Sequence, residues 1–225
     1  MKLTEKDLLT GISRDLGLES KNEAYVVSDR KFDYRTDAIS AQTIQAHQEL
    51  LDGYVDTLNR VSAELDTADK ESANSNDSVF RSLKIDEIYN LNAAFLHGLF
   101  FDNISETSRI TADSLSFLRL ERDFGTFDNW QRDFIATAMS ARSGWAITVY
   151  NSFLRRYMNV AVDLHSTNVP FSSYPVIVLD VWEHAYYRDY LDDRKKYIFA
   201  MMKQLNWKAI DERFQRAEEI GEVFK

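Results

Sequence analysis

The chain has 225 residues, a formal net charge of −9 at pH 7, and a hydrophobic content of 44%. That apolar content is sufficient for a folded core and excludes a globally disordered chain. Surfaces that bind phosphate gather Lys and Arg, so the acidic balance argues against nucleic acid as a partner. The chain contains no cysteine, which excludes disulfides, iron–sulfur clusters and thiolate zinc sites. Any metal must therefore bind to nitrogen and oxygen atoms.

The N-terminal part of the sequence predicts one short helix followed by an extended lead-in. Residues 4–15 show a helical pattern that stops near Gly17. The apolar members of this pattern are Leu8, Leu9 and Ile12, with Leu16 beyond. It lacks the uninterrupted apolar stretch of a secretory signal, and no run approaches the roughly 18 to 20 apolar residues that span a bilayer. We therefore expect a cytoplasmic protein without a membrane partner, in which residues 1–32 form an N-terminal extension.

Two long helices are predicted next, joined by a turn-rich loop at residues 68–78. Ser40 is a candidate N-cap for the first helix, which should span roughly two dozen residues. Its apolar face contains Ile44, His47, Leu51, Tyr54, Val55 and Leu58. The face of the second helix expected to pack on the first contains Ile85, Ile88, Leu91, Phe95 and Leu99. We expect an antiparallel hairpin domain over residues 33–108.

The remainder of the chain, residues 109–225, mixes helical and β patterns. Helical patterns are expected at about 113–123 and 127–141, and the tail returns to helix from about Tyr186. Between them lie three β-rich runs, WAITVY (145–150), YMNVAV (157–162) and YPVIVLDVW (174–182). The predicted fold class is therefore α+β, with an N-terminal antiparallel long-helix hairpin and a C-terminal α/β domain that contains a small three-stranded antiparallel sheet.

The four histidines of the chain are the candidates for metal chemistry. His47 and His97 lie on the two long helices, and an imidazole from each facing helix is how such folds build metal sites. Asp180 ends the third β run, and His184 follows one helical turn later, so both side chains can converge on one point. A carboxylate with neutral imidazoles suits iron, manganese or zinc better than copper(I) or calcium. From these residues alone a packed or surface role for each histidine stays open.

Several segments resemble one known family. DVWEHAYY (180–187) resembles, residue for residue, the metal-binding signature of the iron/manganese superoxide dismutases. ISAQ (39–42) followed by His47, and LHGLFFDN (96–103), are similar to the segments that carry the first two ligands of that family. The resemblance extends from about residue 33 to the C-terminus. It implies an enzyme that disproportionates superoxide to dioxygen and hydrogen peroxide by redox cycling of one iron or manganese ion.

The resemblance also implies roles for individual residues. The metal ligands would be His47, His97, Asp180 and His184. Trp145 and Trp182 would line the metal pocket, with Tyr54 and Arg194 near the substrate funnel. Glu183 and Tyr187 would lie at the interface of a homodimer, or of a tetramer built from it.

The sequence departs from the family pattern in the surroundings of the metal. His47 and Tyr54 are seven residues apart rather than the usual eight, which predicts a regular helix without a bulge. The glutamine that usually contacts the metal-bound solvent is missing, because Ala93 occupies the helical position and residues 162–168 contain no glutamine. His165 is the expected substitute, and Asn168 is the alternative. The preference between iron and manganese stays open, and a cambialistic enzyme is compatible with the sequence.

Two other functions stay open at this point. One is a different non-haem iron oxidoreductase that uses two histidines and a carboxylate, in which one of the three ligand histidines is dispensable. The other is a metal-binding protein on the same fold that has lost or altered its redox activity.

Overall fold

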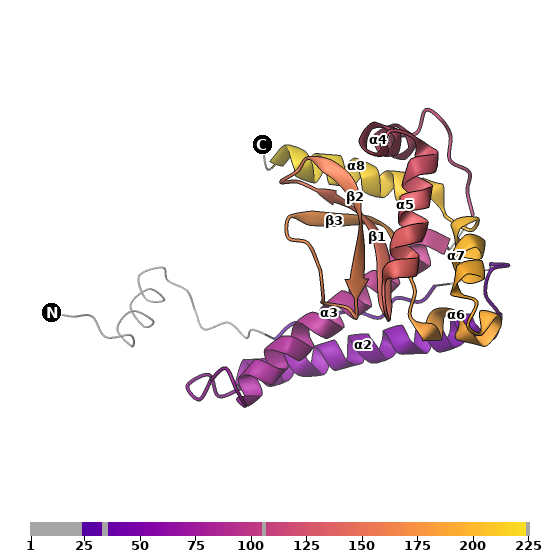
Figure 1. Cartoon of the computed structure of the whole chain (residues 1–225). Coiled ribbons are helices and arrows are strands. Elements are labelled where there is room, and N and C mark those ends of the chain that lie inside the picture. Colours follow the sequence, from indigo (N-terminus) through magenta and orange to yellow (C-terminus); the bar gives the residue numbers. More distant parts are fainter. Residues whose placement is uncertain (1–23, 33–35, 105–106, 224–225) are drawn as a thin grey trace.

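Seven helices and one three-stranded sheet form the described part of the chain, which in this computed structural model comprises residues 24–32, 36–104 and 107–223 (Figure 1). The helices are α2 (Ala41–Thr67), α3 (Val79–Ile104), α4 (Leu115–Phe124), α5 (Phe127–Ser140), α6 (Glu183–Tyr190), α7 (Arg194–Met202) and α8 (Trp207–Val223). The strands are β1 (Gly144–Asn151), β2 (Arg156–Asp163) and β3 (Ser173–Asp180). This architecture confirms the predicted α+β fold class. The helix expected at residues 4–15 lies outside the described residues.

Helices α2 and α3 form the predicted antiparallel hairpin; α2 lies along one edge of the molecule, and α3 rises from it behind the sheet (Figure 1). The N-cap prediction is also confirmed, because the Ser40 side chain accepts a hydrogen bond from the Thr43 backbone N–H at 3.2 Å. Helix α2 is α-helical without interruption, as the seven-residue spacing of His47 and Tyr54 predicts. Both side chains consequently lie on the same side of α2.

The predicted packing face of α3 is wrong. Its residues Ile85, Ile88, Leu91 and Phe95 are 41% to 50% exposed. The side chains that α3 buries belong to a different row, which includes Leu83, Ala93, Leu96, His97, Phe100 and Ile104. Helix α3 carries apolar residues on both sides, so its helical periodicity does not reveal which side faces the core.

The sheet has the strand order β2-β1-β3, and both pairs are antiparallel. Its central strand, β1, is buried at every position. Gly144 begins this strand where the neighbouring backbone is very close: an added Cβ would lie 2.0 Å from the Val162 carbonyl oxygen. Larger residues cannot occupy this position without moving β2.

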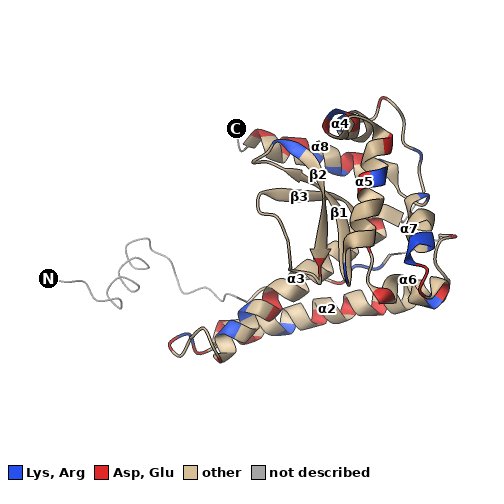
Figure 2. Cartoon of the chain, viewed as in Figure 1, with Lys and Arg blue, Asp and Glu red and all other residues tan. Residues whose placement is uncertain are grey.

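Helices cover the sheet. Helix α3 packs on β3, α5 packs on β1 and β2, and α8 packs on β3. Charged residues are spread over the helices, whereas the strands are almost free of them (Figure 2). The contact between α3 and β3 joins the hairpin to the rest of the protein, and the domain division after residue 108 stays a prediction. Among the described residues, no helix is long and apolar enough to cross a membrane.

Candidate metal centre

Four side chains from four different elements meet where the hairpin contacts the end of the sheet. They are His47 of α2, His97 of α3, Asp180 at the end of β3, and His184 of α6. One nitrogen or oxygen atom from each lies within 4.8 Å of those of the other three. Asp180 Oδ2 is central to the group, at 3.1 Å from His47 Nε2, 3.3 Å from His184 Nε2 and 3.6 Å from His97 Nε2. The structure thus brings together all four of the predicted ligands.

Neighbouring backbone groups orient the cluster. His97 Nδ1 donates to the Ala93 carbonyl oxygen at 2.7 Å, so its Nε2 carries a lone pair, and this buried atom has no hydrogen-bond partner. Asp180 Oδ1 accepts from the Trp182 backbone N–H at 2.8 Å, and the Tyr197 hydroxyl donates to the Asp180 carbonyl oxygen at 2.8 Å. The remaining carboxylate oxygen, Oδ2, is therefore directed toward the histidines.

Burial and mutual charge set the protonation of these groups. Burial raises the pKa of the Asp180 carboxyl. The nearby His184 and His47 lower that pKa by a larger amount, so the net pKa lies well below its usual range. Burial lowers the pKa of His47, and it lowers the pKa of His97 to about 3. Burial also acts against a charged His184, but Asp180 outweighs it and raises the pKa of His184. The centre thus holds an ionised carboxylate beside at least two neutral imidazoles.

This donor set fits one metal ion. An ionised carboxylate and neutral imidazoles are the forms that coordinate a metal, and together they suit iron or manganese. A buried imidazole nitrogen that has a free lone pair and no hydrogen-bond partner is costly unless a ligand satisfies it. The His97 Nε2 atom meets this description, so the cluster could bind a single ion.

Two tryptophans lie beside the cluster. Trp145 is paired with Asp180 across β1 and β3, and its ring lies 4.9 Å from the His97 ring at 88°. The Trp182 ring stacks on the rings of His165, at 5.2 Å, and His184, at 5.8 Å. These two rings place apolar surface beside the centre and limit the access of water.

His165 is fully buried next to the centre. It lies in a tight turn in which Asp163 and Thr167 exchange two backbone hydrogen bonds, of 3.2 and 3.1 Å. The Trp145 indole N–H donates to His165 Nδ1 at 3.0 Å. Because an indole N–H can only donate, Nδ1 is an acceptor and the hydrogen of the neutral ring is on Nε2. That Nε2 lies 3.1 Å from the Tyr54 hydroxyl oxygen, to which it donates.

The structure distinguishes His165 from the alternative, Asn168. Asn168 is exposed on the same turn, with a positive φ of 66°, whereas both nitrogens of His165 are bonded within the site. Burial lowers the pKa of His165 to about 4, which keeps the ring neutral. Of the two candidates, His165 is the one buried beside the cluster, with its N–H group bonded to Tyr54; its role in place of the missing glutamine stays a prediction.

Two further residues at this site were not found from the sequence. The Tyr89 ring lies 4.7 Å from the His165 ring at 77°, and the Asn92 side-chain amide donates to the His165 carbonyl oxygen at 2.9 Å. Both are on α3, eight and five residues before His97. Both residues lie on the helix that carries the candidate ligand His97, which could have marked them as neighbours of the site. Nothing in the sequence indicated a contact with the turn that contains His165, which follows Asn92 by 73 residues.

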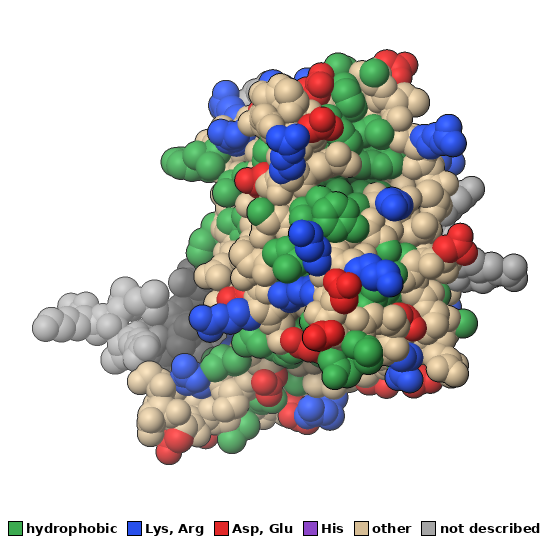
Figure 3. All heavy atoms as spheres, turned by 45° about the vertical axis from the view of Figure 1, so that its right-hand side comes forward, with side chains coloured by type: hydrophobic (Ala, Val, Ile, Leu, Met, Phe, Trp, Pro, Cys, Tyr) green, Lys and Arg blue, Asp and Glu red, His purple; other side chains and the backbone are tan. Residues whose placement is uncertain are grey.

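The other predicted site residues lie near the cluster without joining it. Glu183 and exposed Tyr187 border a surface hollow together with His47 and His184, and Glu183 accepts a hydrogen bond from the Ser143 hydroxyl at 2.9 Å. Arg194 donates to the carbonyl oxygens of Ala141 and Val181, both at 2.6 Å. On the side of the molecule that carries α5 and α7, charged and apolar side chains are interspersed (Figure 3). The interface and funnel roles of these residues stay predictions.

The fold and the cluster define a mononuclear metalloprotein whose ion would be held by three imidazoles and one carboxylate. Residues 116–213 match the family "Iron/manganese superoxide dismutases, C-terminal domain". The chain is 36% identical to "Superoxide dismutase [Mn] 1" of Halobacterium salinarum, over 80% of this chain and 89% of the relative. It is 34% identical to "Superoxide dismutase [Fe]" of Aquifex pyrophilus, over 84% of this chain and 90% of the relative. The chain belongs to the iron/manganese superoxide dismutase family.

Proposed function

We propose that this chain converts two superoxide anions and two protons into dioxygen and hydrogen peroxide, using one iron or manganese ion held by His47, His97, Asp180 and His184. The observation that carries the proposal is the set of three imidazoles around the ionised Asp180 carboxylate, with the unpartnered His97 Nε2 directed at it. Membership of the family supports this reaction. Relatives named for each metal leave both ions as candidates.

When bound, the ion would supply one-electron redox chemistry by alternating between two oxidation states. The task of the protein is to hold the ion and to control its surroundings. Asp180 contributes the negative charge of the ligand set, and the backbone bonds to Ala93 and Trp182 fix the orientation of two ligands. The rings of Trp145 and Trp182 keep water away from the site, which strengthens electrostatic interactions within it.

In this proposal Tyr54 and His165 handle the protons of the reaction. Burial raises the pKa of Tyr54 to about 12, with further contributions from Tyr89 and Asp180, so the phenol keeps its proton at neutral pH. Because the Tyr54 oxygen accepts the hydrogen of His165 Nε2, its own O–H remains available as a donor. The Tyr54 ring lies 5.2 Å from the His97 ring. In this proposal Tyr54 donates protons to the product, and His165 acts by positioning Tyr54.

Residues at the surface around the cluster would attract the substrate and form the subunit interface. The net charge of −9 does not attract an anionic substrate such as superoxide. Arg194 would supply local positive charge that does. Glu183 and Tyr187 would lie at the interface of a homodimer or tetramer in the cytoplasm. Light scattering of the chain and of its Glu183→Ala variant would test the interface, since loss of this contact should shift the chain toward monomers.

The test of the function is to load the purified chain separately with iron and with manganese, and to measure metal content and superoxide consumption. We expect one ion per chain and activity in at least one form. If both forms hold one equivalent of metal and neither consumes superoxide, the chain is a metal-binding protein without this activity. If alanine at His47, His97 or His184 leaves metal binding intact, a site of two histidines and a carboxylate would account better for the chemistry.

A further inference from the structure

The outer side of α3 carries a row of apolar residues that the described part of the chain leaves about half exposed. The row consists of Ile85, Ile88, Leu91 and Phe95, which are between 41% and 50% exposed. Their spacings of three, three and four residues place them on one side of the helix. Single exposed apolar side chains are common on soluble proteins, whereas a contiguous row indicates an interaction surface. We refer to these four residues as the outer row.

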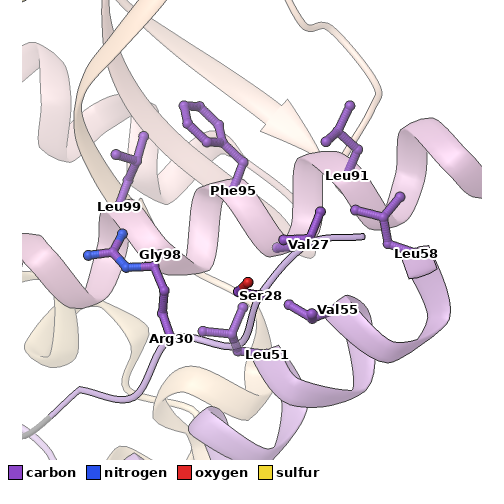
Figure 4. Close-up of a pocket in the computed structure, with 11 residues that line it drawn as sticks. Val27, Ser28, Arg30, Leu51, Val55, Leu58, Leu91, Phe95, Gly98 and Leu99 are labelled. Atoms are coloured by element: carbon purple, nitrogen blue, oxygen red, sulfur yellow. The ribbon is translucent and has the colours of Figure 1, made fainter. Parts of the chain in front are cut away.

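The outer row borders an apolar groove between α2 and α3 (Figure 4). The groove has a volume of about 220 Å³ and shares Leu91 and Phe95 with the row. Its α2 side consists of Leu51, Val55 and Leu58, all of which are buried. Val27, Ser28 and Arg30 lie between the two helices (Figure 4). One stretch of the N-terminal part of the chain is thus already seated against this surface.

Specific hydrogen bonds hold that stretch in place. The Tyr25 backbone N–H donates to Ser62 Oγ at 2.7 Å, and the Tyr25 hydroxyl donates to the Glu87 carboxylate at 3.1 Å. The amide side chain of Asn59 bonds to both the N–H and the carbonyl oxygen of Val27, at 2.7 and 3.0 Å. Because Glu87 precedes Ile88 on α3, the chain before Tyr25 begins beside the outer row.

We propose that residues 4–16 form an amphipathic helix that docks on the outer row of the same chain. The apolar residues of this segment, Leu8, Leu9, Ile12 and Leu16, share one side of a helix, whereas Asp7 and Arg14 lie on the other. The segment is too short to be a stable helix on its own in water, so its helical pattern requires a surface to pack on. Residues 1–23 carry four basic and five acidic residues, so apolar burial rather than net charge drives the contact.

The dimensions fit. Residues 4–16 would form a helix about 20 Å long, and the outer row from Ile85 to Phe95 spans about 15 Å at the same rise of roughly 1.5 Å per residue. Residues 17–23 would connect the two, and seven extended residues reach about 23 to 25 Å. This short tether gives the segment a high effective concentration at the outer row, which favours it over a separate partner.

Cysteine pairs test the proposal directly, because the natural chain has no cysteine. Ile12→Cys is combined in turn with Ile85→Cys, Ile88→Cys, Leu91→Cys and Phe95→Cys in the full-length chain. The matched controls use Arg14→Cys with the same four positions, since two residues along a helix change the direction of a side chain by about 200°. Disulfide formation under mild oxidation is followed by mass spectrometry and non-reducing electrophoresis.

We expect at least one Ile12 pair to form an intrachain disulfide about tenfold faster than its Arg14 control, because docking raises the effective concentration of one side of the helix only. Equal rates for the two series would overturn the proposal. Disulfides that join two chains would also overturn it, and would identify the outer row as an interface between copies. The test does not depend on metal or activity, so its outcome is independent of the proposed reaction.

Discussion

The two sides of α3 show how one helix can serve a buried site and an exposed surface. The inner side carries His97 among fully buried side chains such as Phe100, and its contacts orient a candidate metal ligand. The outer side carries a row of equally apolar residues that are about half exposed. Hydrophobicity is therefore similar on both sides, and the difference lies in what packs against them.

Removal of the central carboxylate should have the largest effect. We expect Asp180→Ala to weaken metal binding by more than about 100-fold, since loss of residues that merely support a ligand already costs 10- to 100-fold. Metal content after dialysis, measured together with superoxide consumption, checks this. Asp128→Ala, at an exposed position of α5, is the matched control and should retain metal. One equivalent of metal in dialysed Asp180→Ala would contradict the proposed ligand set.

Truncation on the two sides of α3 should differ in its cost to stability. Phe100→Ala should reduce the free energy of unfolding by about 3 to 5 kcal/mol, because it leaves a cavity in the core. Ile88→Ala should cost about 1 kcal/mol, since a side chain covered only by a docked surface segment loses less apolar contact on truncation than a core side chain does. Urea denaturation of both variants measures the two values. Similar losses would mean that the outer row is as completely covered as the core.

Replacement of His165 should slow the reaction without releasing the metal. We expect His165→Ala to reduce kcat by about 10- to 100-fold, as is typical of groups that orient the surroundings of a metal. His165→Gln should recover part of the loss, because an amide can both accept from Trp145 and donate to Tyr54. Asn168→Ala, on the exposed part of the same turn, is the control. Unchanged activity in His165→Ala would remove this residue from the mechanism.

The smallest effect concerns the outer side of the hairpin and depends on pH. Burial and the Glu87 carboxylate raise the pKa of Tyr25 to about 12, above the value near 10 of an unfolded chain. The contribution of this pair to stability is therefore full below pH 10 and is lost as the pH rises from 10 through 12. We expect the difference in stability between the natural chain and Tyr25→Phe to decrease over that range. A difference that stays constant from pH 8 to pH 11.5 in denaturation experiments would contradict this assignment.

Much of the fold could be predicted from local patterns. The Ser40 cap, the loop at 68–78 and the three β-rich runs correspond to structural elements at nearly the predicted residues. The DVWEHAYY motif indicated Asp180 and His184 directly, because two candidate ligands four residues apart are a property of local sequence. His47 and His97 required only the additional assumption that the two long helices pair.

The surroundings of the centre could not be predicted in the same way. His165 was found by noting the absence of glutamine, but its partners Trp145 and Tyr54 come from β1 and α2. Tyr89 and Asn92 were missed because their contact with His165 is made between α3 and a distant turn. The packing face of α3 was predicted incorrectly, since both of its sides have apolar residues at helical spacing.

The sequence by itself determined the elements, the candidate ligand residues and the resemblance to the family. These follow from helical and β periodicity, from capping residues and from one contiguous motif, all of which act over a few neighbouring residues. Only the tertiary structure decided which side of α3 is buried, which nitrogen of His165 carries the hydrogen, and that its N–H donates to Tyr54. Those properties depend on which surfaces meet and on which polar atoms burial forces to pair, and residues far apart in the chain supply both partners.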